Sequence, residues 1–89
     1  MDVAVIGGGD TAVEEAHYLT RFARSVTIIH RRDAFRATKI SQEAVFANKK
    51  ISIIWNTRVT AIEGNTGVER LVLLDNKGQH SIRAVEGVF

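Results

Sequence analysis

The chain has 89 residues, enough for one small domain built around a single core. Its 45% hydrophobic and 25% charged residues are typical of a globular protein and exclude a disordered, collagen-like or coiled-coil chain. Twelve Lys and Arg against ten Asp and Glu leave a net charge of +2, which is too small to indicate a broad nucleic-acid-binding surface.

Several other classes of protein and site are excluded by what the chain lacks. Cysteine is absent, so these residues can form no disulfide, thiolate metal site or redox dithiol, and the three histidines lack the spacing of metal ligands. No apolar run approaches the roughly 18 residues that a membrane span needs, and the first residues lack the basic start of a targeting segment. We therefore expect no metal site, no membrane association, and redox chemistry only from a cofactor or from other chains.

The first third of the chain has the pattern of a strand, a helix and a second strand. Residues 2–6 (DVAVI) are a β-branched apolar run that ends in three glycines, which is typical of a buried strand entering a tight turn. Apolar residues at steps of three and four then predict a helix over 11–23. Residues 25–30 (SVTIIH) predict another strand, and this spacing is that of a βαβ crossover with parallel strands.

The alternation of strand and helix continues and then stops. A polar stretch leads into a weaker helical pattern over 38–48, which Asp33 is predicted to cap. Residues 51–55 (ISIIW) predict a third parallel strand, and β-prone runs separated by GNTG and NKG predict an antiparallel meander over about 57–83. Residues 85–89 (VEGVF) have the pattern of a strand that has only begun.

Together these elements predict an α/β fold. It is a partial Rossmann-like βαβαβ parallel sheet with an antiparallel β-meander after the third strand and a truncated final strand. A complete doubly wound sheet usually has more parallel strands, and no linker or repeat divides the chain. We therefore expect residues 1–89 to form one incomplete domain from a longer protein.

The turn after the first strand carries the pattern G-x-G-x-x-A. Its spaced glycines permit a tight turn and the close approach of a pyrophosphate, and the alanine lets the helix pack closely on the strand. Free N–H groups at the start of the helix face the phosphates. Because strand and helix flank the motif at the expected distances, we predict dinucleotide binding. The motif consists of Gly7, Gly8, Gly9, Asp10, Thr11 and Ala12. For Asp10 and Thr11, capping of the helix is an equally good explanation.

The end of the second strand bears on the choice of cofactor. NAD-specific sites commonly place an acid there to accept a hydrogen bond from the ribose 2′-hydroxyl. This chain has His30, Arg31 and Arg32 instead, with Arg36 nearby. Guanidinium groups match the oxygens of a 2′-phosphate, which a carboxylate would repel. We therefore predict NADP(H). The alternative is a solvated basic loop in which Asp33 pairs with an arginine.

The remaining conspicuous side chains have simpler interpretations. We expect Trp55 and Phe46 to lie in the core and His80 to be exposed in a hairpin, and the acids of the first helix suit the helix dipole. No nucleophile with a base and no carboxylate pair suggests itself, so the residues alone predict a binding module without catalytic residues.

Two longer strings, GGGDTAVEEAHYLTRFA and HRRDAFRA, resemble the NADPH-binding domain of the low-molecular-weight thioredoxin reductases, and the resemblance covers essentially the whole chain. In that family NADPH passes hydride to FAD, which reduces the disulfide of a C-x-x-C pair, and the resulting dithiol reduces the disulfide of thioredoxin. The resemblance implies that Arg31, Arg32 and Arg36 hold the 2′-phosphate, that His30 lies beside the adenosine ribose, and that the glycine motif lines the pyrophosphate. It also implies that Glu14 lies toward the nicotinamide.

The C-x-x-C dithiol and the FAD domain of that family have no counterpart in this sequence. The resemblance therefore implies that FAD binds outside these residues in the parent protein and that this chain alone is inactive. It implies NADP(H) and, for the parent, thioredoxin as partners, no nucleic acid, and a cytoplasmic location, or an organellar one in a eukaryote.

Three alternatives stay open at this point. The first is a parent that is a ferredoxin-NADP reductase of the same two-domain plan, which shares the HRRD-type loop. The second is a small basic binder of nucleic acid or other polyanions, whose affinity should fall steeply with salt. The third is a structural fragment that pairs its unfinished sheet edge with another copy as a homo-oligomer.

Overall fold

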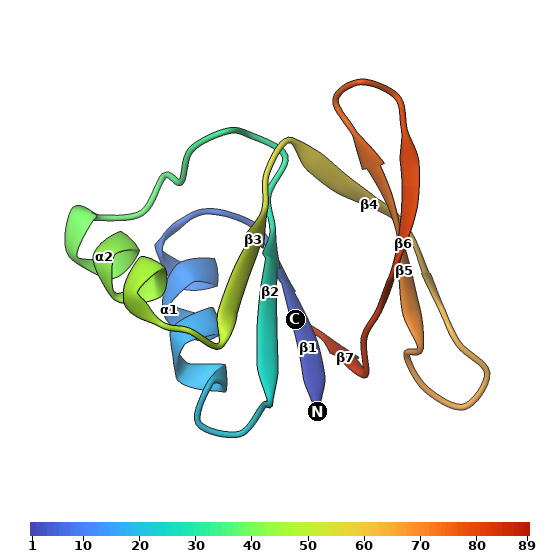
Figure 1. The fold of residues 1–89 in the computed structure, drawn as a ribbon, viewed down its shortest axis with the longest axis horizontal. Helices are drawn as coiled ribbons and strands as arrows, with labels where there is room; N and C mark the ends of the chain where they lie inside the picture. Colours follow the sequence, from blue (N-terminus) through green and yellow to red (C-terminus); the bar gives the residue numbers. More distant parts are fainter.

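Short β-branched strands build a parallel sheet at the centre of the protein. Figure 1 shows the fold in a computed structural model that describes residues 1–89. The sheet has the order β3-β2-β1-β7, and all neighbours are parallel. This is the order of one half of a doubly wound sheet, in which the chain moves outward from β1 to β2 and then to β3. The strands are β1 (Asp2–Ile6), β2 (Ser25–Ile29), β3 (Ile51–Ile54) and β7 (Gly87–Val88).

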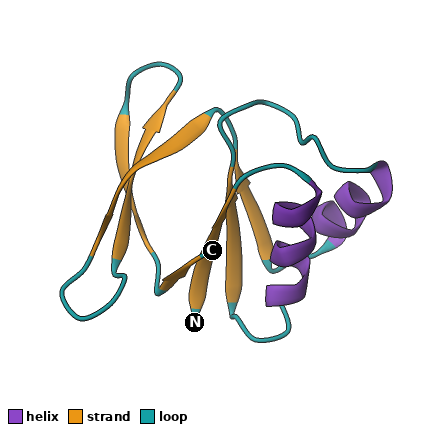
Figure 2. Ribbon diagram, turned by 180° about the vertical axis from the view of Figure 1, so that it is seen from behind, coloured by secondary structure: helices purple, strands orange, loops and turns teal.

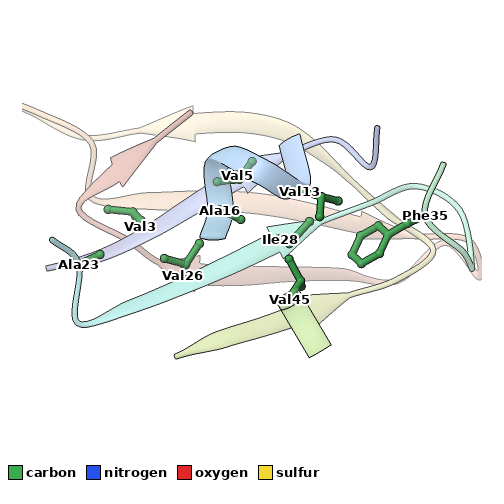
Figure 3. Close-up of a cluster of buried hydrophobic side chains, with 9 residues drawn as sticks. All are labelled: Val3, Val5, Val13, Ala16, Ala23, Val26, Ile28, Phe35 and Val45. Atoms are coloured by element: carbon green, nitrogen blue, oxygen red, sulfur yellow. The ribbon is translucent and has the colours of Figure 1, made fainter. Parts of the chain in front are cut away.

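The two crossover helices, α1 (Asp10–Leu19) and α2 (Lys39–Ala47), cover one face of this sheet. Their apolar stripes and the facing side chains of the strands form the larger of two cores, shown in Figure 3. Neither helix is long and apolar enough to cross a membrane. The nine buried members of this core are Val3, Val5, Val13, Ala16, Ala23, Val26, Ile28, Phe35 and Val45.

The antiparallel meander covers the other face. It consists of β4 (Thr57–Glu63), β5 (Arg70–Asp75) and β6 (His80–Ala84), with a register shift between Val59 and Ala61. Figure 2 shows the resulting three layers of helices, parallel sheet and meander. Because both of its faces are covered, four of the five residues of β2 are buried, and Thr27 is the one polar residue among them. The second core, between the two sheets, contains Ala4, Ile29, Leu71, Leu73 and Val85.

The predicted fold class is therefore confirmed, but two details of the helices are wrong. Helix α1 ends at Leu19 and not near Ala23, because the following residues turn to bring Arg24 N–H to the carbonyl of Met1, 2.7 Å away, where β2 begins beside β1. Asp33 does not cap α2. The cap is Thr38, whose hydroxyl oxygen accepts a hydrogen bond from the N–H of Ser41 at 3.3 Å.

Two of the three predictions for large side chains hold. Trp55 packs against the larger core and His80 is exposed in the β5–β6 hairpin region. Phe46, however, is 57% exposed. The only fully buried side chain of α2 is Val45, so its neighbour Phe46 is turned by one helical step toward solvent, where it stacks on Phe35.

Candidate functional site

The carboxyl ends of β1 and β2 lie at one edge of the parallel sheet, where ligands usually bind in open α/β sheets. Two loops leave this edge side by side in Figure 1: the glycine turn, Gly7–Gly9, and the arginine loop, Arg31–Thr38. A cavity of about 380 Å³ opens between them and the start of β4. Seven of the predicted cofactor residues line it, namely Gly7, Gly8, Gly9, His30, Arg31, Arg32 and Arg36.

A second cavity, of about 310 Å³, lies on the other side of the glycine turn. It shares all three glycines with the first cavity, so the turn is a wall common to both. The remaining predicted residues of the glycine motif, Asp10, Thr11 and Ala12, line this second cavity, together with Glu15 and Phe89. Glu14 is exposed and lines neither cavity, whereas its neighbour Glu15, for which the sequence suggested only a role at the helix dipole, does.

The three glycines of the turn differ in whether the fold requires a glycine at that position. Gly7 has φ +136°, a conformation that side chains rarely adopt, and a Cβ there would lie 3.2 Å from the Cβ of Ala12. A Cβ on Gly8 would overlap the imidazole ring of His30. A Cβ on Gly9 would meet no atom within 4 Å, and its backbone, at φ −84° and ψ −178°, is open to any residue. The protein itself therefore does not require a glycine at position 9.

His30 is a buried support beneath the glycine turn. The side chain is only 6% exposed, and its Nε2 lies 2.9 Å from the carbonyl oxygen of Ala34 in the arginine loop. A carbonyl oxygen only accepts, so Nε2 carries the proton in this hydrogen bond. The ring also packs at the edge of Trp55, with centroids 6.1 Å apart. His30 thus borders the first cavity while it connects the end of β2 to the arginine loop.

The three arginines of the loop have no anionic partner in the protein. Arg31, Arg32 and Arg36 are exposed, and none of them forms a salt bridge. Asp33 forms none either, so the alternative in which it pairs with an arginine is not what the structure contains. The cavity therefore has three uncompensated positive charges along one wall.

Two hydrogen bonds hold the arginine loop against the glycine turn. The backbone N–H of Arg36 donates to the carbonyl of Gly8 at 2.7 Å, and the backbone N–H of Thr38 donates to Oδ1 of Asp10 at 2.8 Å. Asp10 is the first residue of α1, but neither it nor Thr11 caps the helix, because the cap is Gly9 and no side chain bonds there. The predicted capping role is thus wrong, and Asp10 instead joins the two loops.

Sequence reasoning missed the part of the cavity that comes from β4. Thr57, Arg58 and Val59 line it, and Arg58 also lines a neighbouring cavity of about 240 Å³. The signal was present, since β4 begins immediately after the carboxyl end of β3, at the same edge as the two loops. No pattern within the chain, however, predicts that the meander folds back so that its first strand borders the same cavity as the glycine turn.

Comparison with known proteins agrees with this geometry. Residues 2–77, which include the glycine turn, the arginine loop and most of the meander, match the sequence family described as pyridine nucleotide-disulphide oxidoreductase. The chain belongs to this family. Within the pyridine nucleotide-disulphide oxidoreductases it is 55% identical over 89 residues to a thioredoxin reductase of Mycolicibacterium smegmatis, and 47% identical over 92 aligned positions to one of Listeria monocytogenes.

Solved structures of thioredoxin reductases have the same fold. The enzyme from Streptococcus pyogenes superimposes with a TM-score of 0.97 at 49% identity over 99% of this chain. The resemblance inferred from the two sequence strings is therefore confirmed, and the parent family is one of oxidoreductases. The chain spans less than a third of the length of these relatives, 29% for both the M. smegmatis protein and the S. pyogenes structure.

Proposed function

We propose that this chain is the NADP(H)-binding domain of a thioredoxin reductase. The observation that carries the proposal is the first cavity, which combines a glycine turn at the start of a helix with three arginines that have no anionic partner. Its volume of about 380 Å³ is in the range of small-molecule sites, which begins at roughly 300 Å³.

The arrangement of the two cavities supports a definite orientation of the dinucleotide. A dinucleotide has its pyrophosphate in the middle and a nucleoside at each end, and the glycine turn lies between the two cavities. The open side of Gly9 leaves room for the pyrophosphate to approach the backbone at the N-terminus of α1, where the helix dipole favours negative charge. The 2′-phosphate of the adenosine would then lie among Arg31, Arg32 and Arg36, and the nicotinamide would lie toward the second cavity.

In this proposal the chain binds and orients the cofactor, and the nicotinamide supplies the hydride. FAD, the C-x-x-C dithiol and the contact with thioredoxin belong to the other parts of the parent reductase. Thioredoxin as the partner is supported by a relative from Mycobacterium leprae, a bifunctional thioredoxin reductase/thioredoxin, which is 53% identical over 89 residues. A cytoplasmic location and a homo-oligomer of this chain also stay predictions.

The direct test is to titrate the chain with NADPH and NADH in parallel by calorimetry, at low and at moderate salt. We expect NADPH to bind at least tenfold more tightly than NADH. A tenfold difference in affinity corresponds to about 1.4 kcal/mol of binding free energy, and one hydrogen bond to a charged group contributes roughly 1.5–3 kcal/mol. The double variant Arg31→Ala with Arg32→Ala should remove most of this preference and leave NADH binding nearly unchanged.

A matched control removes two positive charges at the opposite edge of the sheet. Arg21 and Lys49 are exposed and precede β2 and β3, so Arg21→Ala with Lys49→Ala should preserve the preference for NADPH. Equal losses for both cofactors in the Arg31 and Arg32 variant would contradict the proposal. Binding of any polyanion, with a steep salt dependence and no preference for NADPH, would favour the polyanion-binding alternative instead.

A further inference from the structure

We infer that Asp10 is a positioning residue that sets the preference for NADPH by holding the arginine loop against the glycine turn. The inference rests on the function proposed above, since it assigns to Asp10 control over the arginines of that site. It starts from a conflict of charge. A carboxylate that directly follows a turn that receives a pyrophosphate repels the ligand of that turn, so this residue type needs a compensating role.

Helix capping does not supply that role. Gly9 is the cap of α1, and no side chain bonds to the free N–H groups there. Oδ1 of Asp10 instead accepts the backbone N–H of Thr38 at 2.8 Å, a contact between residues 28 positions apart. Thr38 is in turn the cap of α2, because its hydroxyl accepts the N–H of Ser41. Asp10 therefore connects the first turn of one helix to the start of the other.

This bond is one of several that hold the arginine loop, in which the N–H of Asn56 also donates to the carbonyl of Arg32 at 3.0 Å and Nε2 of Gln42 to that of Ala37 at 2.8 Å. Three of these bonds fall on alternate residues around Arg36. On one side of Arg36, the ring of His30 is hydrogen-bonded to the carbonyl of Ala34. At Arg36 itself, the backbone N–H donates to Gly8 at 2.7 Å. On the other side, Thr38 is held by Asp10. Alternate residues of the loop are thus tied to β2, to the glycine turn and to α1.

The loop needs these ties because it has little other structure. Residues 31–38 contain no helix or strand, and the three arginines among them are exposed. Positive side chains on a mobile loop would lose conformational freedom when they close on a phosphate, whereas a loop that is already held loses less. Asp10 therefore strengthens binding of the cofactor that has the 2′-phosphate, and has little effect on the one that lacks it.

The test compares Asp10→Ala with Asp10→Asn. Both variants remove the negative charge, but only the asparagine keeps an oxygen that can accept the Thr38 N–H. We expect the ratio of NADPH to NADH affinity, measured by calorimetry, to fall roughly tenfold in Asp10→Ala and to be kept in Asp10→Asn. If the carboxylate only repels the cofactor, both variants will tighten both cofactors equally. If it is only a fold-stabilising tie, Asp10→Ala will weaken both cofactors equally. Either result overturns the inference.

Hydrogen exchange of the unsubstituted chain gives a second measurement that does not depend on the folding of a variant. The amides of Arg36 and Thr38 should exchange at least tenfold more slowly than that of Asp33, which has no hydrogen-bond partner. Equal exchange at the three amides would overturn the inference.

The function and the role of Asp10 can fail separately. If the Arg31 and Arg32 variant loses the NADPH preference while Asp10→Ala keeps it, the function stands and the role of Asp10 is wrong. If the unsubstituted chain folds but prefers neither cofactor, the proposed function itself is wrong, and the inference falls with it.

Discussion

At the scale of single residues, the glycine turn separates what the fold needs from what a ligand needs. Gly7 is required by its backbone conformation, and Gly8 by the ring of His30 packed against it. Gly9 faces open space at the N-terminus of α1 and has an ordinary backbone conformation. Neighbouring positions of one motif should therefore respond differently to the same added methyl group.

We predict that Gly8→Ala destabilises the fold, whereas Gly9→Ala leaves the fold stable and blocks cofactor binding. The methyl group in Gly8→Ala overlaps the His30 ring, so we expect a loss of about 1–3 kcal/mol in the free energy of unfolding, measured with urea. Gly9→Ala should change this free energy by no more than about 0.5 kcal/mol, because its methyl group meets no protein atom. Its NADPH affinity should nevertheless fall at least tenfold. Unchanged binding by Gly9→Ala would show that no phosphate approaches the backbone there.

Arg58 extends the positive charge of the site onto the meander. It lines the first cavity as a fourth arginine, together with Arg31, Arg32 and Arg36. We predict that Arg58→Ala weakens NADPH binding several-fold and lowers its dependence on salt, since one cation fewer faces the ligand. Lys77→Ala is the control, because it removes a charge from the meander region and Lys77 lines none of the cavities. Identical salt dependence in the Arg58 variant and this control would contradict the prediction.

At the scale of the elements, β2 is the strand on which both cores depend. Ile28 faces the helices and Ile29 faces the meander, and each is at most 1% exposed. We predict that Ile28→Ala and Ile29→Ala each lower the free energy of unfolding by about 2–5 kcal/mol. Ile40→Ala should change it by no more than about 0.5 kcal/mol, because Ile40 is 81% exposed on α2. Chemical denaturation measures the free energy of unfolding of the three variants. A small effect of Ile29→Ala alone would mean that the meander does not pack on the sheet in solution.

The start of β1 is joined to β2 by an exposed ion pair. Nη2 of Arg24 lies 2.9 Å from Oδ2 of Asp2, and the hydroxyl of Ser25 donates to Oδ1 at 2.7 Å. These hydrogen bonds, with that from Arg24 the stronger influence, hold the pKa of Asp2 well below its usual value of about 4. Because the pKa is lower in the folded state, the contribution to stability is complete above about pH 4 and is lost as pH falls toward the folded-state value.

We therefore predict that acid destabilises the chain partly through Asp2. In Asp2→Asn, the decrease in the free energy of unfolding between about pH 4 and pH 2 should be shallower than in the unsubstituted chain. Added salt should reduce the difference, since the pair is exposed. Urea unfolding at several pH values measures the effect, and parallel pH profiles would contradict it.

At the scale of the whole molecule, the first cavity draws on all three parts of the architecture. The glycine turn comes from the β1–α1 connection, the arginine loop from the β2–α2 connection, and Arg58 from the meander that covers the opposite face of the sheet. A ligand in this cavity contacts segments that are held together only in the folded chain. Binding should therefore stabilise the chain as a unit.

We predict that NADPH raises the melting temperature of the chain more than NADH at the same concentration. A ligand at 100 times its Kd stabilises the folded state by about 2.7 kcal/mol, and at its Kd by only about 0.4 kcal/mol. Differential scanning calorimetry with each cofactor measures the shift. Equal shifts would contradict a site that recognises the 2′-phosphate, as would a larger shift with NADH.

Local sequence determined those features that depend on neighbouring residues. The β-branched run before three glycines, the apolar spacing of the first helix and the turns such as Asn76–Gly78, where Gly78 has φ +84°, were enough to predict the strands, the parallel and antiparallel layers and the position of the glycine turn. The three arginines at the end of β2 followed in the same way, because the carboxyl ends of parallel strands meet at one edge.

Only the tertiary structure decided how the loops at that edge are held and which side chains face the cavity. Asp10 bonds to a residue 28 positions away, His30 supports Gly8 from the neighbouring strand, and Arg58 reaches the site from the meander. The same holds for the start of α2 at Thr38 and the exposure of Phe46. These features depend on the distance in space between segments far apart in the chain, and no pattern within a single segment specifies that distance.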